Sequence, residues 1–201
     1  MAIFGDRHHN QIMALTPELL LRAYANGFFP MGDPETGEIH WYRPDPRAIL
    51  PLEKFHRSRS LTRTLNKKTF DVSFNQDFAS VIRACRRPDT WITDDILTAY
   101  ESLHQKGHAH SVEVWKEGKL SGGVYGVTLA GAFFAESMFH FATDASKVAL
   151  HHLVTHLMRK HFCLLEVQFL TPHLASLGAE EISDTQYQTL LEKALKTPAV
   201  F

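Results

Sequence analysis

The sequence predicts an α+β protein in which helices cover a mixed β-sheet. Of its 201 residues, 44% are hydrophobic and 21% are charged, as in ordinary globular domains. The longest apolar run, Gly122–Phe139, alternates glycines with β-branched and aromatic residues. These residue types favour strands, so we expect two buried strands that turn near residues 128–131. The order of the expected elements is helices first, then antiparallel strands, then a strand–helix–strand unit, which together indicate the mixed layout.

The first 45 residues are expected to form a small segment that packs on a main domain of residues 46–201. Residues 1–14 carry no strong signal and are expected to be loosely ordered. Thr16 and Pro17 fit the N-cap and first position of a helix that Gly27 would end. A loop is expected over residues 32–37, and the prolines that follow Arg43 require an extended or turning chain. The segment is too short to hold a core of its own.

The main domain is expected to alternate short strands with helices. Expected strands cover residues 47–50, 70–74, 110–115 and 162–169. Expected helices cover residues 59–67, 76–86, 93–104, 145–160 and 171–177. Glu117 and Gly118 favour a hairpin turn, Asp144 is the expected N-cap of the helix that starts at Ala145, and Ser183 with Gln186 forms a capping box for the last helix.

The charge pattern argues against a globally basic nucleic-acid-binding protein but leaves room for a local basic face. The formal net charge is −1, while nine basic residues and three acidic ones lie between Glu53 and Arg87. The N-terminus lacks an apolar signal region, and no apolar run reaches the roughly twenty residues of a membrane span. Cys85 and Cys163 lack metal-binding spacing, and the 13 histidines include no HExxH motif. We therefore expect a cytoplasmic monomer without a metal or a cofactor.

Three polar residues interrupt the apolar strands and are candidates for a functional site. Glu136 lies inside the longest apolar run, and Glu166 and Gln168 would share one face of the strand around them. A buried carboxylate is costly unless a partner satisfies it. The simpler alternatives are a core hairpin whose Glu136 is paired or caps the next helix, and an edge strand with a wet face.

The chain contains a series of ordered blocks between about Leu15 and Leu195, which include FFPM, TWITDDI, GHAHSVEVW, GGVYG, FFAESMF, DASKVAL, LLEVQ and TPHLASLGAEEI. Together these blocks resemble the bacterial leucyl/phenylalanyl-tRNA–protein transferases. The resemblance implies a main domain similar to acyl-CoA N-acetyltransferases and a short form of the family, without the longer N-terminal region of some relatives. It also implies transfer of Leu, Phe and Met from aminoacyl-tRNA to proteins that begin with Arg or Lys, which marks those proteins for N-degron degradation.

The resemblance also implies roles for particular residues. Gln168 matches the family's glutamine at the reacting centre, and Glu136 matches the glutamate of its ESMF block, with Ala135 where glycine is usual. Glu166 stands where the family usually has aspartate, and we expect it to attract the cationic acceptor while Gln168 orients the amine. Candidates for the aminoacyl side-chain pocket are Val124, Phe133 and Met138, for which plain core packing is a close alternative.

Nucleic-acid contacts are expected at two places. Trp91 matches a family tryptophan that would stack on the terminal adenine, and Met31 stands where the family has a second tryptophan. Candidates for contacts with tRNA phosphates are Arg57, Arg59, Arg63, Lys67 and Lys68. Three other functions stay open: an acyltransferase that uses acyl-CoA, a sister leucyltransferase for N-terminal Asp or Glu, and a non-catalytic tRNA-binding protein.

Overall fold

A computed structural model describes residues 15–87 and 90–201, and its centre is a seven-stranded mixed sheet. The strands follow the order β4-β5-β6-β7-β8-β3-β9 across the sheet. Their bounds are β3 Arg47–Ile49, β4 Asp71–Phe74, β5 Ala109–Lys116, β6 Lys119–Leu129, β7 Ala132–His140, β8 Leu164–Gln168 and β9 Glu180–Ile182. All neighbours pair antiparallel except β7 and β8, which are parallel. The α+β class with a mixed sheet is thus confirmed, and the expectation for residues 1–14 lies outside the described residues.

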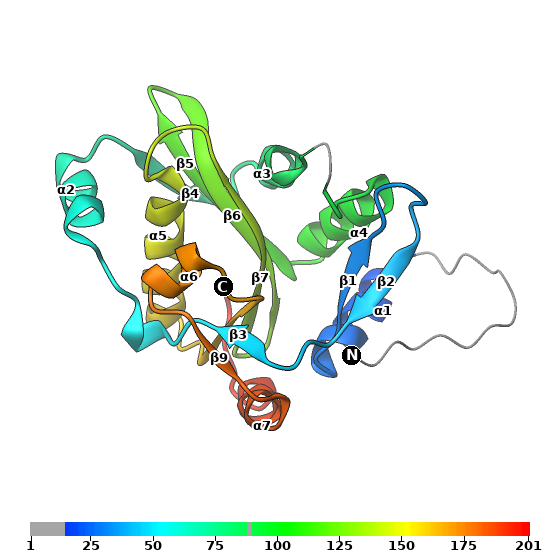
Figure 1. The fold of residues 1–201 in the computed structure, drawn as a ribbon. Helices are drawn as coiled ribbons and strands as arrows, with labels where there is room; N and C mark the ends of the chain where they lie inside the picture. Colours follow the sequence, from blue (N-terminus) through cyan, green and yellow to red (C-terminus); the bar gives the residue numbers. More distant parts are fainter. Residues whose placement is uncertain (1–14, 88–89) are drawn as a thin grey trace, which may run out of the picture.

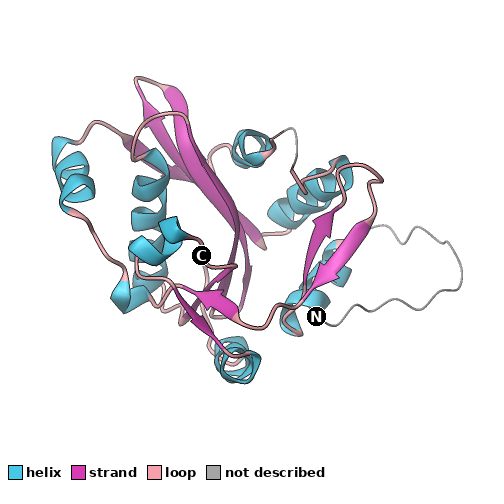
Figure 2. Cartoon of the chain, viewed as in Figure 1, coloured by secondary structure: helices cyan, strands magenta, loops and turns pink. Residues whose placement is uncertain are grey.

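Helices cover both faces of this sheet (Figures 1 and 2). The helices are α1 Pro17–Ala25, α2 Arg59–Lys67, α3 Phe78–Cys85, α4 Asp94–Gln105, α5 Ala145–Arg159, α6 Pro172–Ser176 and α7 Asp184–Leu195, with a short 3₁₀ turn at Leu52–Lys54. Helix α5 packs on one face, and its Leu150, Leu153 and Leu157 join a buried cluster with Val124 and Phe133. Helices α1, α3 and α4 contribute to a second cluster on the other face.

The caps that the sequence predicted are mostly formed. The side chains of Thr16, Thr93 and Ser183 each accept a hydrogen bond from the first turn of their helix, and Ser183 with Gln186 completes the capping box. Asp144 is the exception, because it has a left-handed backbone and its side chain makes no capping bond. Its carboxylate instead accepts hydrogen bonds from Lys147 and Thr64, so Asp144 occupies the predicted N-cap position without capping the helix through its side chain.

The N-terminal part contains a strand pair that the sequence analysis missed. Strands β1 Phe29–Gly32 and β2 Ile39–Tyr42 form a separate antiparallel pair around the expected loop. Leu20 and Tyr24 of α1, together with Phe29, belong to the same buried cluster as residues of the main sheet. The part of the chain before β3 therefore packs on the main body, as expected; the division between residues 45 and 46 stays a prediction.

A bulge in the β6–β7 hairpin interrupts the regular alternation of side chains. Tyr125 pairs with Ser137, and the next residue, Gly126, pairs with Ala135. One residue of β7, Glu136, is therefore extra, and such bulges re-aim the side chains around them. A side chain at Gly126 would have no room, because its Cβ would lie 2.2 Å from the carbonyl oxygen of Phe134.

Strands β7 and β8 pair for only part of their length. The parallel register covers Ala132 with Leu164, Phe133 with Leu165 and Phe134 with Glu166. Both strands continue beyond this point without pairing to each other. Glu136 on β7 and Gln168 on β8 lie beyond the last pair that the two strands form with each other. The candidate functional side chains meet there.

Candidate active site

Glu136 is the centre of a buried hydrogen-bonded network. Its side chain is 6% exposed, Oε1 accepts a hydrogen bond of 2.5 Å from the Tyr24 hydroxyl, and Oε2 accepts one of 3.0 Å from Nε2 of Gln168. Burial raises the pKa of the Glu136 carboxyl to about 8, and the nearby charge of Glu166 adds to the shift. Near neutral pH this group therefore exchanges between an acid and a carboxylate, which makes it suitable for holding or moving a proton.

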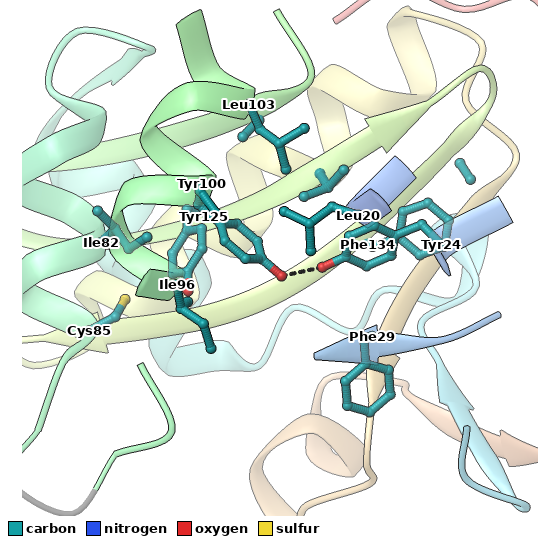
Figure 3. Packing of buried hydrophobic residues seen from close by; sticks show 14 of the residues in the cluster. Leu20, Tyr24, Phe29, Ile82, Cys85, Ile96, Tyr100, Leu103, Tyr125 and Phe134 are labelled. Atoms are coloured by element: carbon teal, nitrogen blue, oxygen red, sulfur yellow. Dashed lines mark hydrogen bonds between the residues drawn. The ribbon is translucent and has the colours of Figure 1, made fainter. Parts of the chain in front are cut away.

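Three tyrosines from three elements surround this carboxyl. Tyr24 comes from α1, Tyr100 from α4 and Tyr125 from β6, and all are fully buried. The hydroxyls of Tyr24 and Tyr100 are hydrogen-bonded to each other (Figure 3). Tyr125 stands edge-on to Tyr100, with ring centroids 5.9 Å apart, and its buried hydroxyl has no partner within the described residues. Within the described residues, the side chains that donate hydrogen bonds to Glu136 are neutral.

Gln168 ends β8 in an unusual backbone conformation. Its φ is +65°, a left-handed value that costs a non-glycine residue energy and that other contacts must impose. Its backbone N–H donates a 2.6 Å hydrogen bond to Oε1 of Glu166, two residues back on the same strand. The turn directs the amide of Gln168 on β8 toward Glu136 on β7.

Glu166 is fully buried and already paired. Its Oε1 also accepts a 2.8 Å hydrogen bond from Nε of Arg47, while Oε2 has no partner within the described residues. Burial raises the pKa of the Glu166 carboxyl, and Arg47 opposes this shift. The expected direct attraction of a cationic acceptor does not fit this geometry, because Arg47 compensates the charge and no surface of the carboxylate is exposed.

The sequence analysis missed Arg47, Tyr24 and Tyr100 as parts of the site. Arg47 opens strand β3, where alternation places it on the same face as Ile49 and opposite Ala48 and Leu50. A basic residue at an inward position of an apolar strand indicates a buried acid nearby, and this signal was available. The tyrosines offered no such signal, because their positions near Glu136 depend on how α1 and α4 pack on the sheet.

The residues expected to line the aminoacyl pocket lie together, but on the other face of the sheet. Val124 and Phe133 are at most 2% exposed in the cluster beneath α5, and Met138 packs against that cluster. Glu136 instead meets Tyr24 and Tyr100 on the face covered by α1 and α4. The three residues therefore do not share a surface with the carboxyl, and their role stays a prediction.

The two residues expected to stack on adenine are brought together. The backbone N–H of Gly32, next to Met31, donates a 3.0 Å hydrogen bond to the carbonyl of Trp91. Both side chains are half-buried and pack against the cluster that contains Tyr24. Gly32 and Trp91 are 59 positions apart in the sequence, so only the fold joins them.

The five expected phosphate contacts form an exposed basic surface. Arg59, Arg63 and Lys67 lie on α2, Arg57 precedes it and Lys68 follows it, and all five are exposed. Among the ion pairs of residues 15–87 and 90–201, none involves these five side chains. In Figure 1, α2 and the β1–β2 pair lie at opposite sides of the sheet.

In the described parts of the chain, residues 15–87 and 90–201, no helix is both long and apolar enough to cross a bilayer.

Comparison with known proteins assigns most of the chain to one family. A family model described as leucyl/phenylalanyl-tRNA protein transferase matches residues 49–192, and the model of that protein's N-terminal domain matches residues 13–45. A leucyl/phenylalanyl-tRNA–protein transferase of Salinibacter ruber is 52% identical over 90% of this chain and 80% of its own length.

A second relative covers more of its own length. The leucyl/phenylalanyl-tRNA–protein transferase of Herpetosiphon aurantiacus is 51% identical over 93% of this chain and 98% of its own length. Among solved structures, a ribosomal-protein-alanine N-acetyltransferase from Brucella melitensis aligns with a TM-score of 0.34 and 17% identity, over 45% of this chain and 73% of that one. On the two family models and the relatives at half identity, the chain belongs to the leucyl/phenylalanyl-tRNA protein transferase family.

Proposed function

We propose that this protein transfers Leu, Phe or Met from aminoacyl-tRNA to the α-amine of proteins that begin with Arg or Lys. Membership of a family of aminoacyl transferases supports the reaction class. The single observation that carries the proposal further is the contact between Glu136 on β7 and Gln168 on β8. The proposed setting is the cytoplasm, the proposed active form is a monomer, and the added residue marks the acceptor for degradation.

The reaction needs no covalent enzyme intermediate. The acceptor's neutral α-amine attacks the carbonyl carbon of the ester and forms a C–N bond. The bond between that carbon and the ribose oxygen of the tRNA then breaks, and the ribose oxygen leaves with the proton that the amine loses. Because the ester is already activated, the enzyme contributes by positioning the two reactants and by stabilising the charge that develops on the carbonyl oxygen.

In this proposal Glu136 holds the α-amino group of the aminoacyl residue. Burial places the pKa of Glu136 at about 8, and a free α-amino group has a pKa of about 7.7–8.0. A carboxyl and an amine with such close pKa values share a proton readily, and a bound ammonium would favour the ionised carboxylate. The hydroxyl of Tyr24 keeps one carboxylate oxygen in place, and the amide of Gln168 donates a hydrogen bond to the other.

Gln168 orients the attacking amine, and Glu166 supports it from behind. The amide Nε2 of Gln168 is engaged with Glu136, which leaves its side-chain oxygen to accept a hydrogen bond from the acceptor amine. Glutamine is too weak a base to remove the proton, so its contribution is orientation. Glu166 acts through the backbone N–H of Gln168 and does not contact the acceptor.

Substrate binding is assigned to three further groups. Val124, Phe133 and Met138 are proposed to shape the apolar pocket for the transferred side chain. Trp91 and Met31 are proposed to stack against the terminal adenine of the tRNA. The basic surface of α2 is proposed to hold tRNA phosphates, and its exposure without ion pairs supports this role.

The charge balance of the site favours a basic acceptor over an acidic one. Glu136 and Glu166 are both buried, and Arg47 is the one basic residue bonded to either of them within the described residues. With Glu136 ionised, the network carries excess negative charge, which would attract an N-terminal Arg or Lys and repel Asp or Glu. This argument ranks the sister specificity for acidic N-termini second.

The test is to incubate the purified protein with radiolabelled Leu-tRNA and two acceptor proteins that differ only in their first residue, Arg or Asp. We expect label on the Arg acceptor and loss of label with Gln168→Ala, while tRNA binding by that variant is unchanged. Label on the Asp acceptor alone would establish the sister specificity. Retention of tRNA without transfer to either acceptor would make the protein a binding module and refute the proposal.

A further inference from the structure

Arg47 is a buried arginine that the proposed chemistry does not use. It is 0% exposed, and its guanidinium makes contacts with three separate parts of the chain. Nε donates to Glu166 on β8 at 2.8 Å, Nη1 donates to the backbone carbonyl of Gly27 at 3.0 Å, and Nη2 reaches the hydroxyl of Tyr187 on α7 at 3.4 Å. A buried charge is retained only where its partners compensate the loss of hydration, which these contacts do.

Two aromatic rings also contact the Arg47 guanidinium. The guanidinium carbon lies 4.8 Å from the ring centroid of Phe29 on β1 and 4.5 Å from that of Tyr187. The planar fork of arginine can donate in several directions while its faces contact rings, whereas lysine is a single point charge. The geometry is therefore specific for arginine rather than for positive charge alone.

One oxygen of Glu166 joins Arg47 to Gln168. Oε1 accepts a 2.8 Å hydrogen bond from Nε of Arg47 and a 2.6 Å hydrogen bond from the backbone N–H of Gln168. The second hydrogen bond closes the left-handed turn at Gln168, a conformation that needs support from its surroundings. Because Arg47 fixes where that oxygen lies, it also fixes where the turn places the amide of Gln168.

The contacts close into a ring that returns to Glu136. The Gln168 amide donates to Glu136, and Glu136 accepts from Tyr24 on α1. Gly27 lies two residues after the end of α1, and its carbonyl oxygen accepts a hydrogen bond from Arg47, which closes the ring. The same guanidinium therefore holds the strand that carries Gln168 and the helix that carries the hydroxyl on Glu136.

We propose that Arg47 is a positioning residue for the transfer reaction: through Oε1 of Glu166 it sets the backbone turn that presents Gln168 to Glu136. The inference rests on the proposed function for its kinetic readout, but its structural readout does not. Arg47 touches neither reactant, so its removal should lower the rate of transfer and leave the affinity for tRNA unchanged. The effect belongs to orientation, for which a misplacement of about 1 Å costs on the order of a hundredfold in rate.

The experiment separates positioning from simple neutralisation of Glu166. Glu166→Gln removes the buried charge but keeps an oxygen that can accept from Arg47 and from the Gln168 N–H. Arg47→Met is then added to Glu166→Gln, so that the double variant contains no uncompensated carboxylate at this position. Arg43→Met is the matched control, because Arg43 pairs with the partly exposed Asp184 and lies outside the ring.

Three measurements are made on each variant: the single-turnover rate of transfer to an Arg acceptor, the Kd for Leu-tRNA, and hydrogen–deuterium exchange of the peptide that contains residues 164–170. We expect the double variant to transfer at least about tenfold more slowly than Glu166→Gln, with the same Kd and faster exchange at Gln168. Arg47→Lys in the natural background should show the same kinetic loss, while Arg43→Met should match the natural protein.

Equal rates and equal exchange for the double variant and Glu166→Gln would overturn the proposal, since Arg47 would then only neutralise a charge. Full activity of Arg47→Lys would overturn it as well. If the natural protein transferred no label to any acceptor, the proposed function would fail, and the exchange of Gln168 would still decide whether Arg47 sets the turn. Unchanged protection there refutes positioning, and loss of protection supports it.

Discussion

Replacing Glu136 by Gln should stabilise the protein while it removes transfer activity. The natural side chain carries a buried carboxyl that faces the hydroxyl of Tyr24 and the amide of Gln168. Glutamine has the same shape, and an amide rotation at residue 168 would pair its oxygen with the new NH₂ group. The variant therefore keeps two hydrogen bonds and loses the group whose charged form burial disfavours.

The size of the effect follows from the pKa of Glu136, which burial raises from 4.5 to about 8. Between these two values the unfolded chain releases a proton that the folded chain retains, so the free energy of unfolding falls as pH rises. One pH unit of pKa difference corresponds to about 1.4 kcal/mol. The cost of Glu136 is then about 1.4 kcal/mol at about pH 5.5 and about 4 kcal/mol at about pH 7.5.

Urea unfolding of both proteins between about pH 5.5 and pH 8 measures this difference directly. Other groups titrate in the same range, but they are common to both proteins and cancel when the two curves are subtracted. We expect the advantage of Glu136→Gln to grow by about 2.5 kcal/mol from pH 5.5 to pH 7.5. A difference that stays constant across this range would show that the carboxyl ionises in the folded protein at an ordinary pKa, and would refute the proton-sharing role.

Three further outcomes can be measured on the same protein. Arg63→Ala should weaken tRNA binding. In a titration with KCl, the slope of log Kd against log[KCl] should fall by about one, the contribution of one phosphate contact. An unchanged slope would show that α2 is not part of the interface. Gly126→Ala should lower the free energy of unfolding in urea by about 1–3 kcal/mol, because its Cβ would meet a backbone oxygen at 2.2 Å. Arg47→Met alone should cost about 3–5 kcal/mol in the same assay, since it leaves Glu166 unpaired, and Glu166→Gln should restore most of that loss.

Much of the fold could be predicted because its signals are local. The caps at Thr16, Thr93 and Ser183 involve residues within one helical turn, and the β6–β7 hairpin follows from one apolar run with a turn near its middle. The strands that were missed, β1, β2 and β9, have three or four residues each. Such short strands depend on partners distant in the sequence and leave no period to detect.

The faces of β7 could not be predicted, because the bulge changes them. In a regular strand Phe133 and Met138, five positions apart, would point to opposite faces. The extra residue at Glu136 brings them to the same face, beneath α5, and leaves the carboxyl on the other. The bulge thus explains why the three expected pocket residues lie in one cluster, which regular alternation of side chains would not predict. It also explains why they are separated from Glu136.

The two glutamates of the site look equivalent in the sequence and differ in the fold. Each is an acid in an apolar strand, and each is buried. Glu166 has a guanidinium as its partner, whereas Glu136 has the hydroxyl of Tyr24 and an amide. A fixed ion pair beside a carboxyl that titrates near neutral pH separates a structural charge from a mobile proton, which is how paired carboxyl groups acquire different roles. Arg47, 119 residues from Glu166 in the chain, makes the difference, and only the folded structure brings the two together.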